Sequence, residues 1–225
     1  MPAAKRPRPT GAAPGAKAKR ARYHSPLRER QAAQTRQAIL DAALALFAEQ
    51  GWAATTLPAI AGRAGISVDT IYATFGTKSA VLLAVVEVAI VGDDEEAPMA
   101  ERDDFARFAE GRRADRIRTG VRYTMDVYAR SLPILTALRE AAASDEPARE
   151  RLARYGQDRH DLMVAGLTLI LGAEPAPEVV DGVWALLSPE VYGHLVDGRG
   201  WDDQRVEGWF VDMVKAIVAR AGRSS

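Results

Sequence analysis

From Ile39 to Ile217, large apolar residues return every three or four positions along the chain. That spacing places them on one face of an α-helix, because a helix completes a turn in about 3.6 residues. No segment of the sequence alternates apolar and polar residues as a half-buried strand does, and no hairpin signal occurs. Glycine, proline and Ser-Pro positions break the apolar runs into pieces of helix length. The sequence therefore predicts an all-α protein.

The chain divides into three predicted parts. Residues 1–24 consist largely of Pro, Ala, Gly, Lys and Arg. Such a composition buries too little apolar surface to offset the entropy of ordering, so this part is predicted to be a disordered basic arm. Residues 25–92 contain four helical patterns, and an acidic run at 93–96 marks the junction behind them. Residues 93–225 are predicted to form a larger helical domain.

The charge is unevenly distributed, although the net charge is zero. Residues 1–30 carry nine Lys or Arg and one Glu, which leaves the rest of the chain acidic. A basic arm on an acidic body indicates a polyanionic partner, because Lys and Arg bound to phosphates release condensed counterions. A solvated tail has the same composition, so the charge alone leaves both interpretations open.

Two short helical patterns separated by a glycine stand out between residues 56 and 75. Thr56 can cap a helix over residues 57–64 and Ser67 can cap the next, because hydroxyl oxygens accept hydrogen bonds from the free N–H groups at helix starts. Gly65 suits the break between them, since glycine adopts a left-handed conformation without a Cβ clash. This plan matches a helix-turn-helix motif, whose second helix enters the major groove of DNA. Many helical bundles contain such a pair, so the motif alone is moderate evidence.

A longer string of residues is more specific. It comprises Thr35-Arg36-Gln37-Ala38-Ile39-Leu40-Asp41-Ala42-Ala43, Leu46-Phe47, Gly51, Thr55-Thr56, Ile60-Ala61, Ala64-Gly65-Ile66-Ser67, Thr70-Ile71-Tyr72, Phe75, Lys78 and Leu82-Leu83. Over about residues 33–92, without a gap, it resembles the DNA-binding domain of the TetR family. The resemblance implies a homodimeric all-α regulator, usually a repressor that leaves its operator when a small ligand fills the C-terminal core. Residues 93–225 match only in general plan, so no particular ligand is implied.

The predicted DNA contacts follow from the resemblance and from helix geometry. By resemblance, Tyr72 and Lys78 contact phosphates, although a packing tyrosine and an idle surface lysine are the alternatives. Hydroxyls at helix starts suit phosphate oxygens as well as capping, and threonines on the second helix can bond base edges. The predicted DNA-binding residues are Thr56, Ser67, Val68, Asp69, Thr70, Tyr72, Ala73, Thr74 and Lys78. Residues 25–92 hold five basic and five acidic residues, so phosphate attraction is expected mainly from helix starts and the arm.

Aromatic and sulfur-containing side chains interrupt the aliphatic packing between residues 100 and 195. They are Phe105, Phe108, Tyr123, Met125, Tyr128, Met163, Trp184 and Tyr192. Each of them alone is explained by an ordinary core, but together they predict a cavity for a small apolar or aromatic ligand, with Tyr and Trp supplying polar tips.

The last two helical patterns, about residues 178–196 and 203–220, are predicted to make the dimer. By resemblance to the TetR family they form a four-helix bundle between two subunits. The predicted interface residues are Val183, Leu187, Val206, Trp209, Phe210, Met213 and Ile217. Two copies of the helix-turn-helix would then meet successive major grooves, so the operator is expected to be palindromic.

Other function classes find little support in the sequence. His24, His160 and His194 are scattered, and there is no cysteine, so we expect no catalytic site, no metal and no cofactor. No apolar run is long enough for a membrane span, and the expected location is the cytoplasm. The predicted function is a sequence-specific DNA-binding regulator with double-stranded DNA, a second copy and a small-molecule effector as partners. The alternative is a ligand-independent architectural DNA-binding protein, and a central cavity would discriminate between the two.

Overall fold

The structure, a computed structural model, describes residues 26–91 and 103–221. These residues form helices joined by short connections, with no strand among them, which confirms the all-α prediction. The elements are α1 (Pro26–Ala54), α2 (Leu57–Ala64), α3 (Val68–Phe75), α4 (Lys78–Val91), α5 (Asp103–Ala106), the 3₁₀ helix η2 (Arg107–Ala109), α6 (Arg113–Ala142), α7 (Glu146–Leu171), α8 (Pro177–Leu186), α9 (Pro189–Arg199) and α10 (Asp203–Ala221). The predicted arm at 1–24 and the acidic run at 93–96 lie outside the described residues.

The described part of the chain divides into two units between Thr35 and Arg36. The first turns of α1, residues 26–35, belong to the first unit. The packing described below is that of the second unit, from Arg36 onward.

The two short helices α2 and α3 begin and end where the sequence places their caps. The Thr56 Oγ1 accepts a hydrogen bond from the backbone N–H of Ala59 at 3.2 Å. The Ser67 Oγ likewise accepts from the backbone N–H of Thr70 at 3.2 Å. Gly65 ends α2 with a φ of 68°, in the left-handed region that glycine enters without a steric cost. The local capping chemistry therefore explains the boundaries of this helix pair.

The first helix is interrupted at Gly51 but does not end there. Gly51 has φ 73° and ψ −173°, which interrupts the helix, but helical turns resume and continue to Ala54. The carboxylate of Glu140 in α6 accepts a hydrogen bond from the backbone N–H of Trp52 at 2.9 Å. A residue 88 positions away thus satisfies a donor that the interruption frees, and no local pattern could reveal that.

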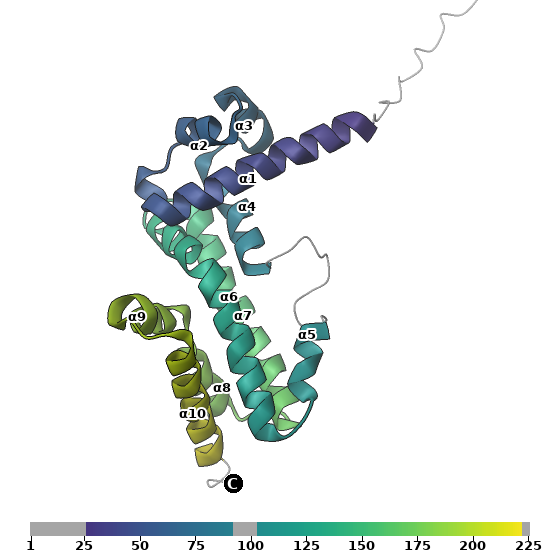
Figure 1. Cartoon of the computed structure of the whole chain (residues 1–225), viewed down its shortest axis with the longest axis vertical. Coiled ribbons are helices and arrows are strands. Elements are labelled where there is room, and N and C mark those ends of the chain that lie inside the picture. The colour runs from purple at the N-terminus through teal and green to yellow at the C-terminus, as the bar shows by residue number, and fades with distance from the viewer. Residues whose placement is uncertain (1–25, 92–102, 222–225) are drawn as a thin grey trace, which may run out of the picture. The chain divides into compact units, whose positions relative to one another are not determined.

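Two hydrophobic clusters form the core of the second unit. The first joins α1–α4 to the C-terminal half of α6 and the N-terminal half of α7. The second joins α5 and η2 to the remaining halves of α6 and α7 and to α8–α10. In Figure 1, α6 and α7 lie side by side as a pair of long helices, and this pair contributes to both hydrophobic clusters. Helices before and after the predicted boundary at residues 92–93 therefore share one cluster, because α4 packs directly on α6 and α7.

Candidate functional site

Helix α3 is anchored on one face and accessible on the other. Ile71 is fully buried and holds α3 in the first hydrophobic cluster. The Ser67 and Thr70 hydroxyl oxygens lie 2.8 Å apart, and the Thr74 hydroxyl donates to the Thr70 carbonyl at 2.7 Å. The positions predicted to face bases are exposed or partly exposed: Val68, Asp69, Thr70, Ala73 and Thr74. The helix therefore presents a surface of small polar side chains on a rigid backbone.

The three predicted phosphate-binding residues Thr56, Tyr72 and Lys78 line one shallow surface hollow. The Tyr72 side chain is 54% exposed at this hollow. The N-termini of α2 and α4 both meet there, and the hydroxyl of Thr77 caps α4 by accepting from the backbone N–H of Ala80 at 3.0 Å. Free N–H groups at helix N-termini attract anions, so the hollow suits a phosphate oxygen. Thr77 was not predicted, although a threonine directly before a helical run is a capping signal.

Lys78 is less free than its predicted role requires. Its ammonium group donates to the backbone carbonyls of Trp52 at 2.7 Å and Thr55 at 2.8 Å, and lies 3.9 Å from the centre of the Trp52 ring. Partial burial lowers the pKa of Lys78 from its ordinary value. Two of its three protons are thus used inside the protein, and only the third remains for a phosphate.

Other basic side chains near α2 and α3 are also engaged within the protein. Arg63 forms a two-point ion pair with Glu49, at 2.6 and 2.8 Å, and this hydrogen bonding lowers the pKa of Glu49. The guanidinium of Arg36 lies 4.6 Å from the centre of the Phe75 ring. Both cations therefore already have partners inside the protein.

A cavity of about 240 Å³ lies between α4, α6, α7 and the segments packed on them. That volume equals about eight water molecules, which is room for a small organic molecule. Gly166 helps to keep it open, because a Cβ added there would contact the rings of Phe105 and Phe108 at 3.5 to 3.6 Å. The lining side chains come from both hydrophobic clusters.

One end of this cavity is aromatic. The ring centres of Phe105 and Phe108 are 4.7 Å apart, and the Tyr123 ring meets Phe108 edge-on at 5.4 Å. Met163 of α7 adds a flexible sulfur-containing side chain to the lining. A cavity lined by aromatic rings in edge-on and tilted contact suits apolar and aromatic ligands.

The other end of the cavity is polar, and the sequence analysis missed it. Its lining includes Glu87 of α4 together with Arg151, Tyr155, Asp158 and Arg159 of α7. Residues 151, 155, 158 and 159 recur at helical spacing, so the charged side chains share one face of α7. A charged residue that interrupts a buried helical face is the signal that could have revealed them.

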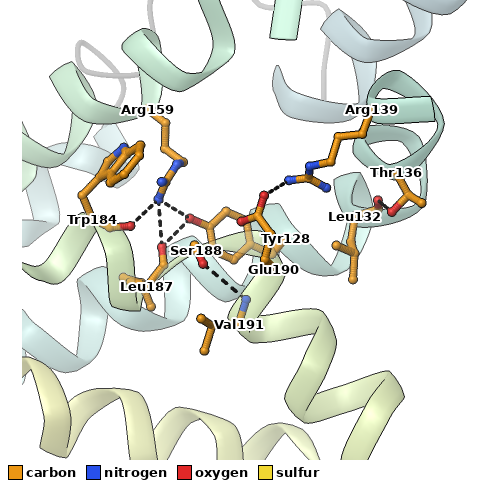
Figure 2. Close-up of polar contacts among 10 residues, drawn as sticks. All are labelled: Tyr128, Leu132, Thr136, Arg139, Arg159, Trp184, Leu187, Ser188, Glu190 and Val191. Atoms are coloured by element: carbon orange, nitrogen blue, oxygen red, sulfur yellow. Dashed lines mark hydrogen bonds and ion pairs between the residues drawn. The ribbon is translucent and has the colours of Figure 1, made fainter. Parts of the chain in front are cut away.

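Arg159 connects the polar end of the cavity to the C-terminal end of α8 (Figure 2). Its Nη1 donates to the carbonyls of Trp184 at 2.8 Å and Leu187 at 3.1 Å, and its guanidinium lies 4.2 Å from the centre of the Trp184 ring. The Tyr128 hydroxyl donates to the same Leu187 carbonyl at 2.6 Å. Burial raises the pKa of Tyr128 to about 12, so this hydroxyl stays protonated at neutral pH. Ser188 caps α9 by accepting from the backbone N–H of Val191 at 3.3 Å.

Comparison with known proteins identifies the helix pair. The family model of "Bacterial regulatory proteins, tetR family" matches residues 39–85. The HTH-type transcriptional regulator BetI of Rhizobium meliloti (strain 1021) is 26% identical over 157 residues, which cover 68% of this chain and 73% of that protein. Residues 39–85 are thus a DNA-binding domain of the TetR type. With this domain the chain is a DNA-binding transcriptional regulator and not an enzyme.

Solved structures show the same TetR-type fold beyond the matched domain. A TetR-family regulator from Mesorhizobium loti has a TM-score of 0.68 at 16% identity, over 84% of this chain and 97% of that one. A regulator from Streptomyces coelicolor has a TM-score of 0.60 at 22% identity, over 84% and 85% of the two chains. The SmeT–triclosan complex has a TM-score of 0.59 at 24% identity, over 81% and 90%.

Five of the eight residues predicted for the ligand pocket of this TetR-type chain line the cavity: Phe105, Phe108, Tyr123, Tyr128 and Met163. The other three do not. Met125 is buried in the second hydrophobic cluster, and Trp184 packs against Arg159 and His160. The Tyr192 ring lies against the Tyr128 ring at 6.1 Å between centres. The prediction used residue type alone. Which side chains reach the cavity depends on the direction in which each helix face points.

The predicted dimer interface stays a prediction, and burial limits which of its residues are accessible. Four of its seven residues are buried inside the single chain and have no surface left for a partner: Val183, Leu187, Val206 and Phe210. Residues 178–196 are not one helix, since α8 and α9 are separated at Leu187 and Ser188. Trp209, Met213 and Ile217 on α10 are partly exposed. One side of the apolar stripe of α10 is therefore buried within the chain. Only the partly exposed side is available to a second subunit.

Within the described ranges, 26–91 and 103–221, no three His, Asp or Glu side chains cluster as metal ligands do. No single helix in these ranges is long and apolar enough to cross a membrane, and α3 and α4 reach that length and composition only together, across a 70° bend.

Proposed function

We propose that this protein is a repressor that leaves a palindromic operator when a small, largely apolar or aromatic molecule binds in the cavity. The observation that carries this proposal is the cavity of about 240 Å³, whose lining includes both α4 and the helices of the C-terminal part. Because α4 follows α3 directly in the chain, a ligand that moves α4 also moves the DNA-binding helix. The TetR-type domain at residues 39–85 and the structural similarity to the SmeT–triclosan complex support it.

The DNA-binding part of the proposal assigns α3 to the major groove and the Thr56–Tyr72–Lys78 hollow to a phosphate. Two copies of α3 in a homodimer would meet grooves about 34 Å apart, or a multiple of that distance. The operator is therefore expected to be palindromic. Since the chromosome is the target, we expect the protein in the cytoplasm.

The experiment begins with selection of an operator from a random double-stranded DNA library, followed by titration in fluorescence anisotropy. A thermal-shift screen of small apolar and aromatic compounds then supplies ligands, and each hit is tested for release of the labelled operator. To shift the balance, a ligand must bind the DNA-incompetent form more tightly, by about 1–3 kcal/mol for typical coupling.

A filled cavity provides the matched control. Gly166→Leu places a side chain among Phe105 and Phe108, whereas Gly156→Leu adds one on the same helix where a Cβ meets nothing within 4 Å. We expect both variants to bind the operator and only Gly166→Leu to lose the response to ligand. If the wild-type protein binds an operator but no compound changes its affinity, the architectural alternative is favoured.

A further inference from the structure

Arg151 occupies an unusual position in the cavity wall. Its side chain is only 10% exposed, and its Nε donates to the Oε1 of Glu87 at 2.6 Å. Its Nη1 is buried and has no hydrogen-bond partner, since the Asp158 carboxylate is 3.9 Å away. A buried charged donor without a partner costs stability, and proteins usually satisfy such groups. The cavity wall thus contains a cationic donor with unused capacity.

We propose that the effector is a small organic acid whose carboxylate binds Arg151 and displaces Glu87, while its apolar body occupies the aromatic end of the cavity. This inference rests on the proposed ligand-sensing function and deepens it by naming the ligand class and the contact that transmits binding.

The burial pattern favours an anion over a cation. The carboxylate-bearing side chains of Glu87 and Asp158 are 60% and 56% exposed, so water can solvate them. The buried charge at this end is therefore that of Arg151, and Arg159 adds a second positive group. Tyr155 is four residues after Arg151 on the same face of α7 and also lines the cavity. Burial raises the pKa of Tyr155, so its hydroxyl remains a donor for a carboxylate oxygen.

Displacement of Glu87 connects the cavity to the DNA-binding helices. Glu87 lies on α4 and Arg151 lies on α7, so their ion pair ties α4 to the long helix pair. A ligand carboxylate would compete with Glu87 for the same guanidinium and free α4 from this contact. Binding of the ligand carboxylate and the Glu87–Arg151 ion pair then exclude each other. Ligand binding is thereby coupled to the contact between α4 and α7.

Two matched series of compounds test the charge of the ligand. They are 4-phenylbutyrate, 4-phenylbutanamide and 4-phenylbutylamine, and octanoate, octanamide and octylamine, each titrated into the full-length protein by calorimetry at pH 7.5. We expect the acid of at least one series to bind roughly tenfold or more tightly than its amide and its amine, because a charge-assisted hydrogen bond contributes about 1.5–3 kcal/mol. Binding of an amide or amine as tight as that of the acid, or binding of none of the six compounds, overturns the proposal.

Variants test the residues. Arg151→Gln should reduce the affinity of the acid to that of its amide, whereas Arg154→Gln, an exposed position on the same helix, should leave it unchanged. Glu87→Gln removes the competitor, so it should tighten binding of the acid while reducing acid-dependent release of the operator. Glu87 is largely exposed, which keeps this variant informative if Arg151→Gln does not fold. Weaker or unchanged acid binding in Glu87→Gln contradicts the displacement.

The outcomes also separate this inference from the proposed function. One outcome is that a neutral or cationic compound releases the operator from the wild-type protein and not from Gly166→Leu. That result would support the proposed ligand-sensing function and contradict an organic acid as the effector. Absence of release by any compound in the general screen would exclude the sensor itself.

Discussion

Lys78 shows how one side chain can serve both the fold and the function. Its ammonium group closes the end of α1 by donating to two backbone carbonyls and covers the Trp52 ring, while the same side chain lines the hollow predicted to hold a phosphate. The resemblance to the TetR family indicated the second role and gave no sign of the first. Substitution of Lys78 therefore has to be interpreted as a change in stability as well as in DNA binding.

We expect Lys78→Ala to lower the free energy of unfolding by about 1–2 kcal/mol, because two charge-assisted hydrogen bonds at a partly exposed site are lost. Tyr72→Phe should change it by less than about 0.5 kcal/mol, since Tyr72 is an exposed residue. Both should weaken operator binding. Urea denaturation measures the first quantity and anisotropy titration the second. An unchanged midpoint for Lys78→Ala would show that its inward hydrogen bonds contribute little.

Tyr128 predicts a pH dependence of stability. Its pKa is about 12 in the folded protein and close to 10 in the unfolded chain. The contribution of the protonated hydroxyl to the free energy of unfolding is therefore fully present below pH 10 and is lost as the pH rises towards 12. The full loss amounts to about 3 kcal/mol. Tyr128→Phe should be less stable at pH 7, where the hydrogen bond to Leu187 is missing, and its stability should fall less between pH 10 and 12. Parallel curves for the two proteins would contradict this.

At the scale of the element, the interruption of α1 is the feature least visible in the sequence. Gly51 adopts a combination of φ and ψ that is nearly confined to glycine, and a Cβ there would lie 2.9 Å from the Glu140 carboxylate. That carboxylate accepts the hydrogen bond from the Trp52 N–H. Gly51 is therefore needed both for the backbone conformation and for the space that the Glu140 carboxylate occupies.

Gly51→Ala should therefore destabilise the protein by about 1–3 kcal/mol. Gly62→Ala is the matched control, because Gly62 lies inside α2, is exposed, and a Cβ there meets nothing within 4 Å. That control should stabilise the protein by about 0.5–1 kcal/mol, since alanine has the higher helix propensity. Chemical denaturation of both variants measures the difference. Equal effects would mean that the interruption of α1 carries no strain.

The sequence predicted those elements whose determinants are local. Thr56, Gly65 and Ser67 define α2 and α3 through capping and backbone freedom, and both depend on a few neighbouring residues. The polar end of the cavity was missed because the pairing of Arg151 with Glu87 joins residues 64 positions apart. The burial of Val206 and Phe210 within the chain was not predicted, since helical spacing identifies an apolar face but does not say which other helix covers it.

At the scale of the molecule, the partly exposed residues of α10 are the expected contact with a second copy. Met213→Asp should convert the dimer to a monomer and weaken operator binding, because a carboxylate would be buried in an apolar interface. Ala219→Asp, on the exposed side of α10 near Asp212, should leave the dimer intact. Light scattering after size-exclusion chromatography measures the mass of each variant. A dimeric Met213→Asp protein would place the interface elsewhere.

The shared core of α4, α6 and α7 has a consequence for protein engineering. Sensors are often rebuilt by grafting the DNA-reading module of one regulator onto the ligand-binding module of another, with the cut placed between them in the sequence. In this chain a cut near residue 92 would separate Val81, Val85 and Val86 from their partners Ile134, Leu135 and Leu138, all fully buried in one cluster. A functional hybrid would have to transplant both sides of that contact, so the exchangeable module includes a part of α6 that lies more than 40 residues beyond the cut.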